Sequence, residues 1–448
     1  MKTLRVSLCL LFISILTTGV LPQAMGAPGA PTGKGTVVIK AARLIDGTGK
    51  APLRNAAVIV KDDRILAVGS ALDIAIPEGA TVVDLGDSTL LPGFLDAHTH
   101  IVGRVLGDPE GTTAYFRDPN GFSEILSVRN AELTLMAGFT TIRNVGARGF
   151  GDMALRKAIN EGWVTGPRIQ AAGHSLGITG GHCDTNGYRE GIIDGDYRTG
   201  IADGPDAVRA AVRYQIKYGA EVIKTCATGG VLSEGDAVGV PQYSYEELRV
   251  MVEEAEKAER KVAAHAHGAE GIKIATRAGV ASIEHGSFLD VEGAKLMAEK
   301  GTFLVPTLMA GETVEALTKS GVIKGFRGEK ALAAATAMRK AIKIAVANKV
   351  RIALGTDAGV IPHGTNAHEF TLLVNWGGID EIDAIKIGTM NTAELLGVAD
   401  ELGSIEVGKL ADLVAVTGDP SINIEQLERT AFVMKNGYIY KNTNTKTP

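Results

Sequence analysis

Residues 91–100 have the sequence LPGFLDAHTH, a short apolar run that ends in two histidines separated by one residue. Along an extended strand, residues i and i+2 point to the same face, so His98 and His100 are expected to project together. Neutral imidazoles in such a pair suit a divalent transition metal. This stretch therefore predicts a strand that carries metal ligands at its end.

The same pattern recurs along the chain, where short apolar runs end in an ionisable side chain. These runs are EVIKTCA with Lys224, KVAAHAH with His265, ASIEHG with His285 and RIALGTDAG with Asp357. In a parallel barrel, chemistry is placed at the strand ends that carry the loops. We therefore expect one shared metal site with the following ligands: His98, His100, Lys224, His265, His285 and Asp357.

Strand-like and helix-like segments alternate between residues 91 and 398. The runs TTIRNVG, RIQAAGH and TFLVPTL complete a set of eight candidate strands, and amphipathic segments such as PDAVRAAVRYQIKYGA lie between them. This alternation predicts an α/β fold, a (β/α)8 TIM barrel over 91–398. An open doubly wound sheet is the alternative, but it would normally show a Gly-rich phosphate loop after its first strand, and none is present.

Both ends of the chain have a different texture from the middle. Residues 36–90 and 399–442 are rich in branched apolar residues and in Gly or Asp breaks, which is typical of short antiparallel strands. We expect one small sheet domain assembled from both ends.

The N-terminus has the three parts of a secretory signal peptide. Lys2 and Arg5 precede an apolar stretch, and small residues up to Ala27 offer a cleavage site, so residues 1–27 predict export to the periplasm or the medium. A membrane anchor is the alternative, although the apolar run is rather short to span a bilayer. The net charge is −5 without a dense Lys/Arg run, so neither nucleic acid nor, after signal removal, a membrane is expected as a partner.

Two cysteines remain after the signal, and two do not make a disulfide framework in a chain of this size. We expect Cys183 and Cys226 to be small packing residues, with a bridge between them as the alternative.

Lys224 is unusual because an isolated buried cation at the end of an apolar strand is costly. It could form a Schiff base, pair with a carboxylate, or react with CO₂ to give a carbamate whose two oxygens bridge two cations. The four histidines and the aspartate favour the carbamate. Asp357 could then ligate one metal, take a proton from a metal-bridging water and pass it to the leaving amine, while the resulting hydroxide attacks the substrate.

The combined motifs LPGFLDAHTH, VIKTC, AAHAHG, IEHG and GTDAG resemble the amidohydrolase superfamily from about residue 36 to 440. The chain is similar to the subtype with a carboxylated lysine and two metal ions. The resemblance implies a distorted barrel and a β-sandwich built from both chain ends. It also implies that His98, His100 and Asp357 hold one zinc ion, that His265 and His285 hold the other, and that the CO₂-derived carbamate on Lys224 bridges them.

Within the superfamily, TTIRNVG, AGHSLGITGGHCD and GTDAGVIPHGTNAHEF resemble exported prolidase-like dipeptidases, which often prefer a C-terminal basic residue, and a related amidohydrolase group that acts on ochratoxin. This implies cleavage of the amide bond of dipeptides or N-acyl amino acids, ochratoxin A included, by a homo-oligomer. A cyclic-amide hydrolase similar to imidazolonepropionase is one alternative, and a Schiff-base lyase using Lys224 is another.

Further polar residues are candidates for contacts with the substrate. Tyr243 could donate a hydrogen bond to the developing oxyanion, and His182 could contact a substrate carbonyl or carboxylate. Arg143 could bind a substrate carboxylate, although a structural ion pair is favoured. Three further residues could line the pocket or simply pack: His267, His363 and Asn366. Acidic residues in two predicted loops could favour a cationic substrate side chain, or could simply be solvated: Asp184, Asp194, Asp196 and Glu234.

Overall fold

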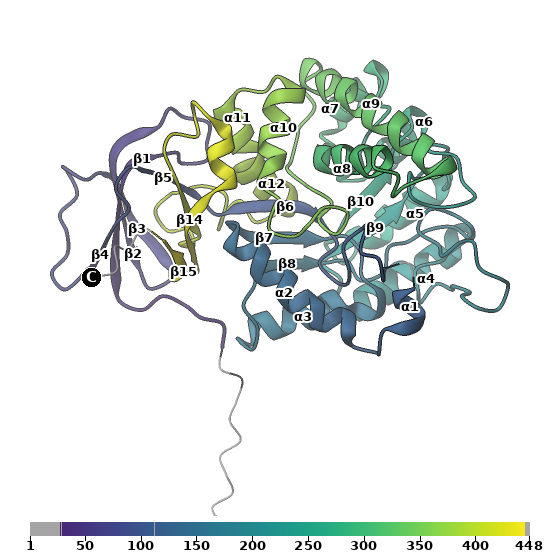
Figure 1. The fold of residues 1–448 in the computed structure, drawn as a ribbon, viewed down its shortest axis with the longest axis horizontal. Helices are drawn as coiled ribbons and strands as arrows, with labels where there is room; N and C mark the ends of the chain where they lie inside the picture. The colour runs from purple at the N-terminus through teal and green to yellow at the C-terminus, as the bar shows by residue number, and fades with distance from the viewer. Residues whose placement is uncertain (1–26, 28, 112, 444–448) are drawn as a thin grey trace, which may run out of the picture.

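The protein contains two kinds of β-sheet, and most of its helices flank one of them (Figure 1). The computed structural model describes residue 27 and residues 29–111 and 113–443. Parallel strands form a four-stranded and a three-stranded sheet, and strands from both chain ends form an eight-stranded sheet. The α/β class predicted from the sequence is confirmed. The predicted signal peptide lies outside the described residues, except for Ala27.

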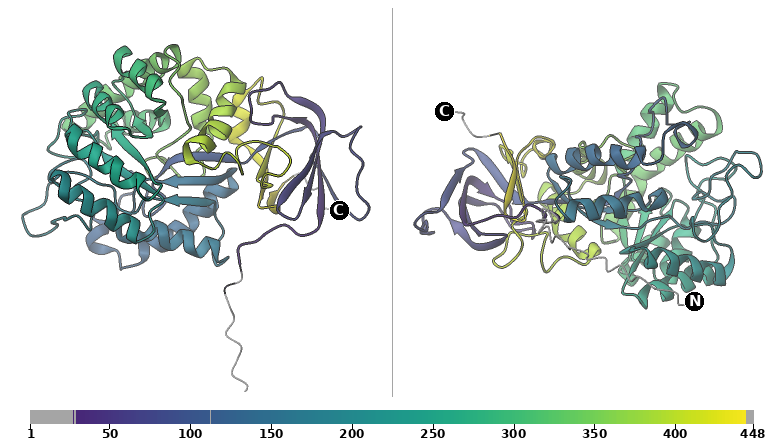
Figure 2. Two further views of the ribbon diagram at one scale, coloured as in Figure 1. Left: turned by 180° about the vertical axis from the view of Figure 1, so that it is seen from behind. Right: turned by 90° about the horizontal axis from the view of Figure 1, so that it is seen from below.

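The eight-stranded sheet joins the two ends of the chain. Its order is β15-β14-β13-β5-β1-β2-β3, with β4 paired to β1. The first five strands are β1 (Thr36–Leu44), β2 (Leu53–Lys61), β3 (Arg64–Ser70), β4 (Thr81–Asp84) and β5 (Ser88–Pro92). The last three are β13 (Leu413–Thr417), β14 (Thr430–Lys435) and β15 (Tyr438–Asn442). Antiparallel pairing of β5 with β13 makes the seam, and both views in Figure 2 place this sheet at one end of the molecule.

Apolar side chains of this sheet pack into a cluster of their own, separate from the larger core of the parallel strands. Ile39, Val58 and Leu90 come from the first part of the chain, and Leu413 and Phe432 come from the last part. Burying these side chains together favours the pairing of two segments that are more than 300 residues apart, because burial of apolar surface is the main driving force of folding. The finer prediction of a β-sandwich stays a prediction.

The parallel strands lie in the middle of the chain. The three-stranded sheet contains β6 (Phe94–Thr99), β7 (Phe139–Asn144) and β8 (Arg168–Ala171). The four-stranded sheet contains β9 (Val222–Cys226), β10 (Lys261–Ala266), β11 (Ser282–His285) and β12 (Phe303–Val305). Seven of the eight strands predicted in this region are therefore present, and all but β8 are almost wholly buried, as the apolar runs require.

The helices follow the parallel strands in the order that the amphipathic segments predict. They are α1 (Ala114–Arg117), α2 (Phe122–Met136), α3 (Gly151–Asn160), α4 (Gly204–Lys217), α5 (Tyr245–Glu256), α6 (Ala269–Ala278), α7 (Val291–Lys300), α8 (Leu308–Lys319), α9 (Gly325–Ala347), α10 (His368–Gly377), α11 (Glu381–Lys386) and α12 (Thr392–Leu396). Short 3₁₀ turns occur at Arg148–Phe150 and Ile424–Glu428, and a π turn occurs at Ile387–Asn391.

The eighth predicted strand, residues 351–359, is not a regular strand. Its backbone changes partners: Ala353 N–H donates to Leu304 at 3.0 Å on one side, and the carbonyl of Leu354 accepts from Ala97 at 2.8 Å on the other. Asp357 then adopts a left-handed backbone with φ of 61°, which turns the chain and ends the pairing. The segment nevertheless joins β12 to β6, and Leu176 joins β8 to β9 through hydrogen bonds with Lys224 and Cys226 at 2.8 Å.

Within the described part of the chain, none of the helices has the length and apolar character needed to cross a membrane.

Candidate metal centre

The ionisable side chains that end the parallel strands meet in one cavity of about 200 Å³. All six predicted ligands line it: His98, His100, Lys224, His265, His285 and Asp357. They come from β6, β9, β10 and β11, from the residue after β6 and from the segment between α9 and α10. The sequence therefore placed these side chains together correctly, since parallel strands present their carboxyl ends at the same edge.

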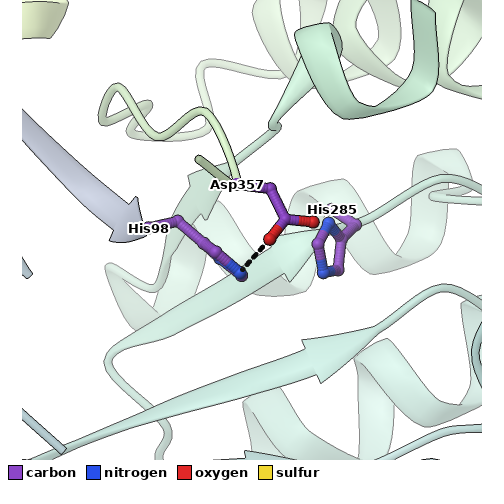
Figure 3. A group of neighbouring side chains, drawn as sticks. All are labelled: His98, His285 and Asp357. Carbon is purple, nitrogen blue, oxygen red and sulfur yellow. Dashed lines mark ion pairs between the residues drawn. The ribbon is translucent and has the colours of Figure 1, made fainter. Parts of the chain in front are cut away.

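Three of these side chains form the tightest group, shown in Figure 3. The ligand atoms of His98, His285 and Asp357 all lie within 4.8 Å of one another, and the three residues are buried. Asp357 Oδ1 lies 3.4 Å from Nε2 of His98 and 3.4 Å from Nε2 of His100. Imidazole nitrogen and carboxylate oxygen atoms at such spacing suit a divalent metal ion.

Two glycines explain how Asp357 comes so near to the histidines. A Cβ atom on Gly355 would lie 2.8 Å from His98 Cβ, and one on Gly359 would lie 2.8 Å from His100 Cβ. Larger residues would push this segment away from β6. The glycines of the GTDAG motif are therefore a packing requirement of the site.

Glu284 orients His98. It is fully buried, and its Oε2 lies 2.7 Å from His98 Nδ1, while Oε1 accepts a hydrogen bond from Arg143 Nη2 at 2.9 Å. Burial raises the pKa of Glu284, but Arg143 and His98 outweigh burial and hold this pKa at about 2. The carboxylate therefore accepts a hydrogen bond from the Nδ1–H group of His98. This fixes the tautomer in which the Nε2 lone pair is directed at a metal.

The remaining histidines are held in a similar way. Nδ1 of His285 lies 2.7 Å from the Thr307 hydroxyl, and Nδ1 of His267 lies 2.7 Å from the Ser287 hydroxyl. Nε2 of His265 is buried and has no hydrogen-bond partner among the described residues. Burial, reinforced by neighbouring cationic groups, lowers the pKa of both His265 and His285 well below the ordinary value. Neutral imidazoles with free lone pairs are the form that binds metal.

Lys224 is buried, with 3% of its surface exposed. Among the described residues, no side-chain hydrogen bond or salt bridge involves its ammonium group. Burial lowers the pKa of Lys224 to about 8, although Glu284 and Asp357 partly oppose this effect. A lysine in this state is readily deprotonated, and the neutral amine is the form that reacts with CO₂ or with a carbonyl compound.

The loop after β8 enters the site through a disulfide and a histidine. Cys183 and Cys226 form a disulfide with a Cα–Cα distance of 5.8 Å, which corrects the expectation that they are separate packing residues. The bond ties this loop to β9, next to Lys224. The neighbouring His182 lines the cavity, as predicted, with its ring centroid 4.2 Å from that of His265.

A hydrogen-bonded relay assigns the tautomer of His182. Ser233 Oγ donates to Asp236 Oδ1 at 2.6 Å and lies 2.8 Å from His182 Nδ1. Because the Ser233 hydroxyl proton is donated to Asp236, the Ser233 oxygen accepts a hydrogen bond from the Nδ1–H group of His182. Burial lowers the pKa of His182 to about 4, so the ring is neutral. Its Nε2 therefore offers a lone pair, whereas the contact with a substrate carbonyl or carboxylate predicted from the sequence would need a donor.

Four predicted substrate or catalytic residues do not reach this cavity. The Tyr243 hydroxyl donates to the backbone oxygen of Ala202 at 3.0 Å and is buried there, so it is not placed to stabilise an oxyanion. The Arg143 guanidinium donates hydrogen bonds to Glu284 and, at 2.6 Å, to the carbonyl of Ala97. It therefore forms the structural ion pair that the sequence favoured.

The other two are His363 and Asn366. The Asn366 amide donates to Asp96 Oδ2 at 2.8 Å in the interior. His363 lines a separate groove beside Leu133 and Glu428. Of the predicted substrate contacts Arg143, His267, His363 and Asn366, only His267 lines the cavity. Sequence spacing missed Glu284, although an acidic residue inside a buried strand was a signal.

The amidohydrolase family model matches residues 89–441. The chain belongs to this family. It is 36% identical to an ochratoxinase of Aspergillus niger over 424 residues, which cover 90% of this chain and 86% of the relative. It is 26% identical to an imidazolonepropionase of Sphingopyxis alaskensis, with 81% of this chain and 87% of the relative covered.

Two solved structures are also similar to this chain. A Xaa-Pro dipeptidase with methionine bound in its active site is 40% identical, with a TM-score of 0.86 over 91% of this chain and 100% of that chain. The A. niger ochratoxinase structure is 34% identical, with a TM-score of 0.80 over 92% and 96% of the two chains. As a member of the amidohydrolase family, this protein is a hydrolase that acts on amide bonds.

Proposed function

We propose that this protein is a metal-dependent amidohydrolase that cleaves the amide bond of dipeptides or N-acyl amino acids, ochratoxin A included. The observation that carries the proposal is the meeting of all six predicted ligands in one cavity. The relatives support it, because one is named ochratoxinase and another is described as a Xaa-Pro dipeptidase.

The residues of the cavity fit a pair of divalent cations. His98, His100 and Asp357 would hold one ion, and His265 and His285 would hold the other. Zinc is proposed from the family resemblance, because nitrogen and oxygen ligands also accept manganese and cobalt. The unpartnered Nε2 of His265 supports this fit, as does Nε2 of His98, which faces the carboxylate of Asp357 at 3.4 Å. When bound, the ions polarise the substrate carbonyl and lower the pKa of the attacking water.

Lys224 would complete the set as a carbamate. Its neutral amine forms an N–C bond with CO₂ and releases one proton, and the product is an anion with two oxygens. The low pKa and the absence of a partner among the described residues support this role, because both leave the amine free to react. The nearby cations would stabilise the new negative charge.

Asp357 would move the proton. Although burial raises its pKa, the neighbouring histidines hold the pKa of Asp357 far below the ordinary value, so it is ionised and can accept a proton from the attacking water. The same carboxyl then delivers the proton to the leaving nitrogen, which is general acid–base catalysis. His182 would accept a hydrogen bond from a substrate N–H group.

The architecture and location are proposed with the function. Residues 91–398 would form a distorted (β/α)8 barrel, supported by the hydrogen bonds that join its two parallel sheets, and residues 36–90 and 399–442 would form a β-sandwich domain. Residues 1–27 would direct export, and the Cys183–Cys226 disulfide suits an oxidising compartment. A homo-oligomer is also proposed, and light scattering of the purified protein tests it.

The function is tested on protein purified without its first 27 residues. Metal content is measured by mass spectrometry, and amide hydrolysis is followed with a panel of Xaa-Arg, Xaa-Lys, Xaa-Pro and N-acyl-Phe compounds. We expect about two metal ions per chain and hydrolysis of at least one class. Protein reconstituted with zinc that hydrolyses none of them would contradict the proposal.

A second candidate is hydrolysis of a cyclic amide. The 26% identity to an imidazolonepropionase favours it, and the same ligands would serve the same chemistry. Cyclic amides in the same panel separate the two functions. Faster turnover of a cyclic amide than of every open-chain compound would favour this second candidate.

A further inference from the structure

Beyond the metal ligands, much of the cavity wall is apolar. The wall is formed by Val231 in the loop after β9, by Ala310, Gly311 and Val314 of α8, and by Ala334 and Met338 of α9. We call these six residues the apolar wall.

The apolar wall is held in place by its own packing. Val231, Val314 and Ala334 belong to one buried cluster that is separate from the main core. Lys330 of α9 ties the loop after β9 to this cluster, because its ammonium donates to the backbone oxygens of Ser233 at 2.8 Å and Asp236 at 3.1 Å. The apolar wall is therefore preorganised for binding a substrate.

Small residues in the wall let α8 and α9 pack closely together and keep the side chains of the wall short. A Cβ atom on Gly311 would lie 2.7 Å from Met338 Sδ, so even a methyl group there would force Met338 to move. Ala310 and Ala334 likewise present only methyl groups. The size of the group that fits is set by α8 and α9.

Charge around the cavity is confined to the metal centre. Among the described lining residues, the carboxylate and ammonium groups are those of Asp357 and Lys224. None of the four acidic loop residues that could attract a cation lines the cavity. Asp184 accepts hydrogen bonds from backbone N–H groups of its own loop, and Glu234 lies 3.8 Å from Arg327.

We infer that the substrate group seated against the apolar wall is uncharged and apolar, so that this enzyme selects amides with a hydrophobic side chain or acyl group and discriminates against cationic ones. The inference rests on the proposed function and names its substrate class. Apolar surface gains free energy when it is buried against such a wall. A lysine or arginine head would lose its water there without finding a carboxylate.

Lysine and norleucine test this directly, because their side chains have nearly the same shape and differ in the ammonium group. Two series of dipeptides carry the variable residue before or after a constant alanine. We expect kcat/KM for norleucine to exceed that for lysine by about tenfold or more in at least one series. Equal or faster hydrolysis of the lysine compounds in both series would overturn the inference while leaving amide hydrolysis intact. Failure to hydrolyse any compound would overturn the proposed function and, with it, the inference.

Two variants locate the preference in the apolar wall. Val314→Asp supplies the missing carboxylate, and Val314→Asn is a control of matched size without the charge. We expect the norleucine-to-lysine ratio to fall about tenfold more in the Asp variant than in the Asn variant. The ratio is measured within one preparation, so a loss of folded protein does not affect it. Equal ratios would overturn the assignment to this wall.

Ala334→Leu provides a second route that introduces no charge. It fills part of the space between α8 and α9, so we expect kcat/KM for phenylalanine compounds to fall about tenfold relative to alanine compounds. An unchanged ratio between the two would show that the substrate does not contact this wall and would overturn the inference.

Discussion

Two lysines in this protein are equally buried but differ in their surroundings. Lys224, in the middle of β9, is 3% exposed, and Lys330, on α9, is 4% exposed. Lys330 donates to two backbone oxygens and forms a salt bridge with Asp236 at 3.2 Å, whereas no such partner of Lys224 occurs among the described residues. A buried ammonium with three acceptors is a structural link. A buried ammonium without such acceptors favours the neutral amine, because burial destabilises the charged form, and the neutral amine is reactive.

The largest expected effect is the loss of activity when Lys224 or Asp357 is changed. Lys224→Ala removes the proposed carbamate, and Asp357→Asn removes the proposed ligand and proton carrier. We expect turnover to fall by about 1,000-fold or more in each, measured as kcat with metal content determined in parallel. Near-normal rates in either variant would refute its role.

Lys330 should show the opposite pattern. Lys330→Met leaves the half-buried Asp236 without its cation and two backbone oxygens without their donor, so we expect the free energy of unfolding to fall by about 2 kcal/mol in urea denaturation. Metal content should stay near that of wild type, since the ligand set is intact. The double variant Lys330→Met/Asp236→Asn should recover part of the loss. Unchanged stability of the single variant would break the contrast between the two lysines.

Glu284 sharpens the contrast because it acts on both Lys224 and the metal centre. Its negative charge is the largest of the charges that raise the pKa of Lys224, and its carboxylate orients His98. In Glu284→Gln, a neutral amide replaces the carboxylate that holds His98 Nδ1. We expect metal affinity to fall by about 10- to 100-fold, measured by chelator competition. Ser282→Ala is the control, because it removes one donor to Glu284 but keeps the carboxylate. Equal affinity of the Gln variant and wild type would count against this positioning role.

A third buried lysine, Lys435 in β14, gives the smallest effect. Its ammonium donates to Gly166 O at 2.6 Å, and burial lowers its pKa to about 8 from the ordinary 10.5. Between these values the unfolded chain binds more protons than the folded protein, so stability contributed by this group rises with pH. We expect a gain of about 1 kcal/mol from pH 7 to pH 9 in wild type relative to Lys435→Met. Parallel pH profiles of the two proteins would contradict this.

The strands and the metal ligands were predictable because their signals are local. Apolar runs such as VIKTC and SIEH are long enough to define a buried strand, and the ionisable residue at each end marks the edge of the sheet. The eighth strand was mispredicted for the same reason. Residues 351–354 have the composition of a strand, but their hydrogen bonds are divided between two neighbours, which no local pattern reveals.

The sequence by itself determined which side chains gather at the metal centre, because strand period and strand ends are properties of short segments. Only the tertiary structure decided which polar groups remain free for chemistry. Tyr243 looked available for substrate, yet its hydroxyl donates to the carbonyl of Ala202. The ion pair favoured for Arg143 needed Glu284 as its partner, and Cys183 bonds to Cys226 across 43 positions of chain. The physical reason is that a buried polar group must be satisfied by whatever partner the packing brings near, and that partner is set by contacts between distant segments.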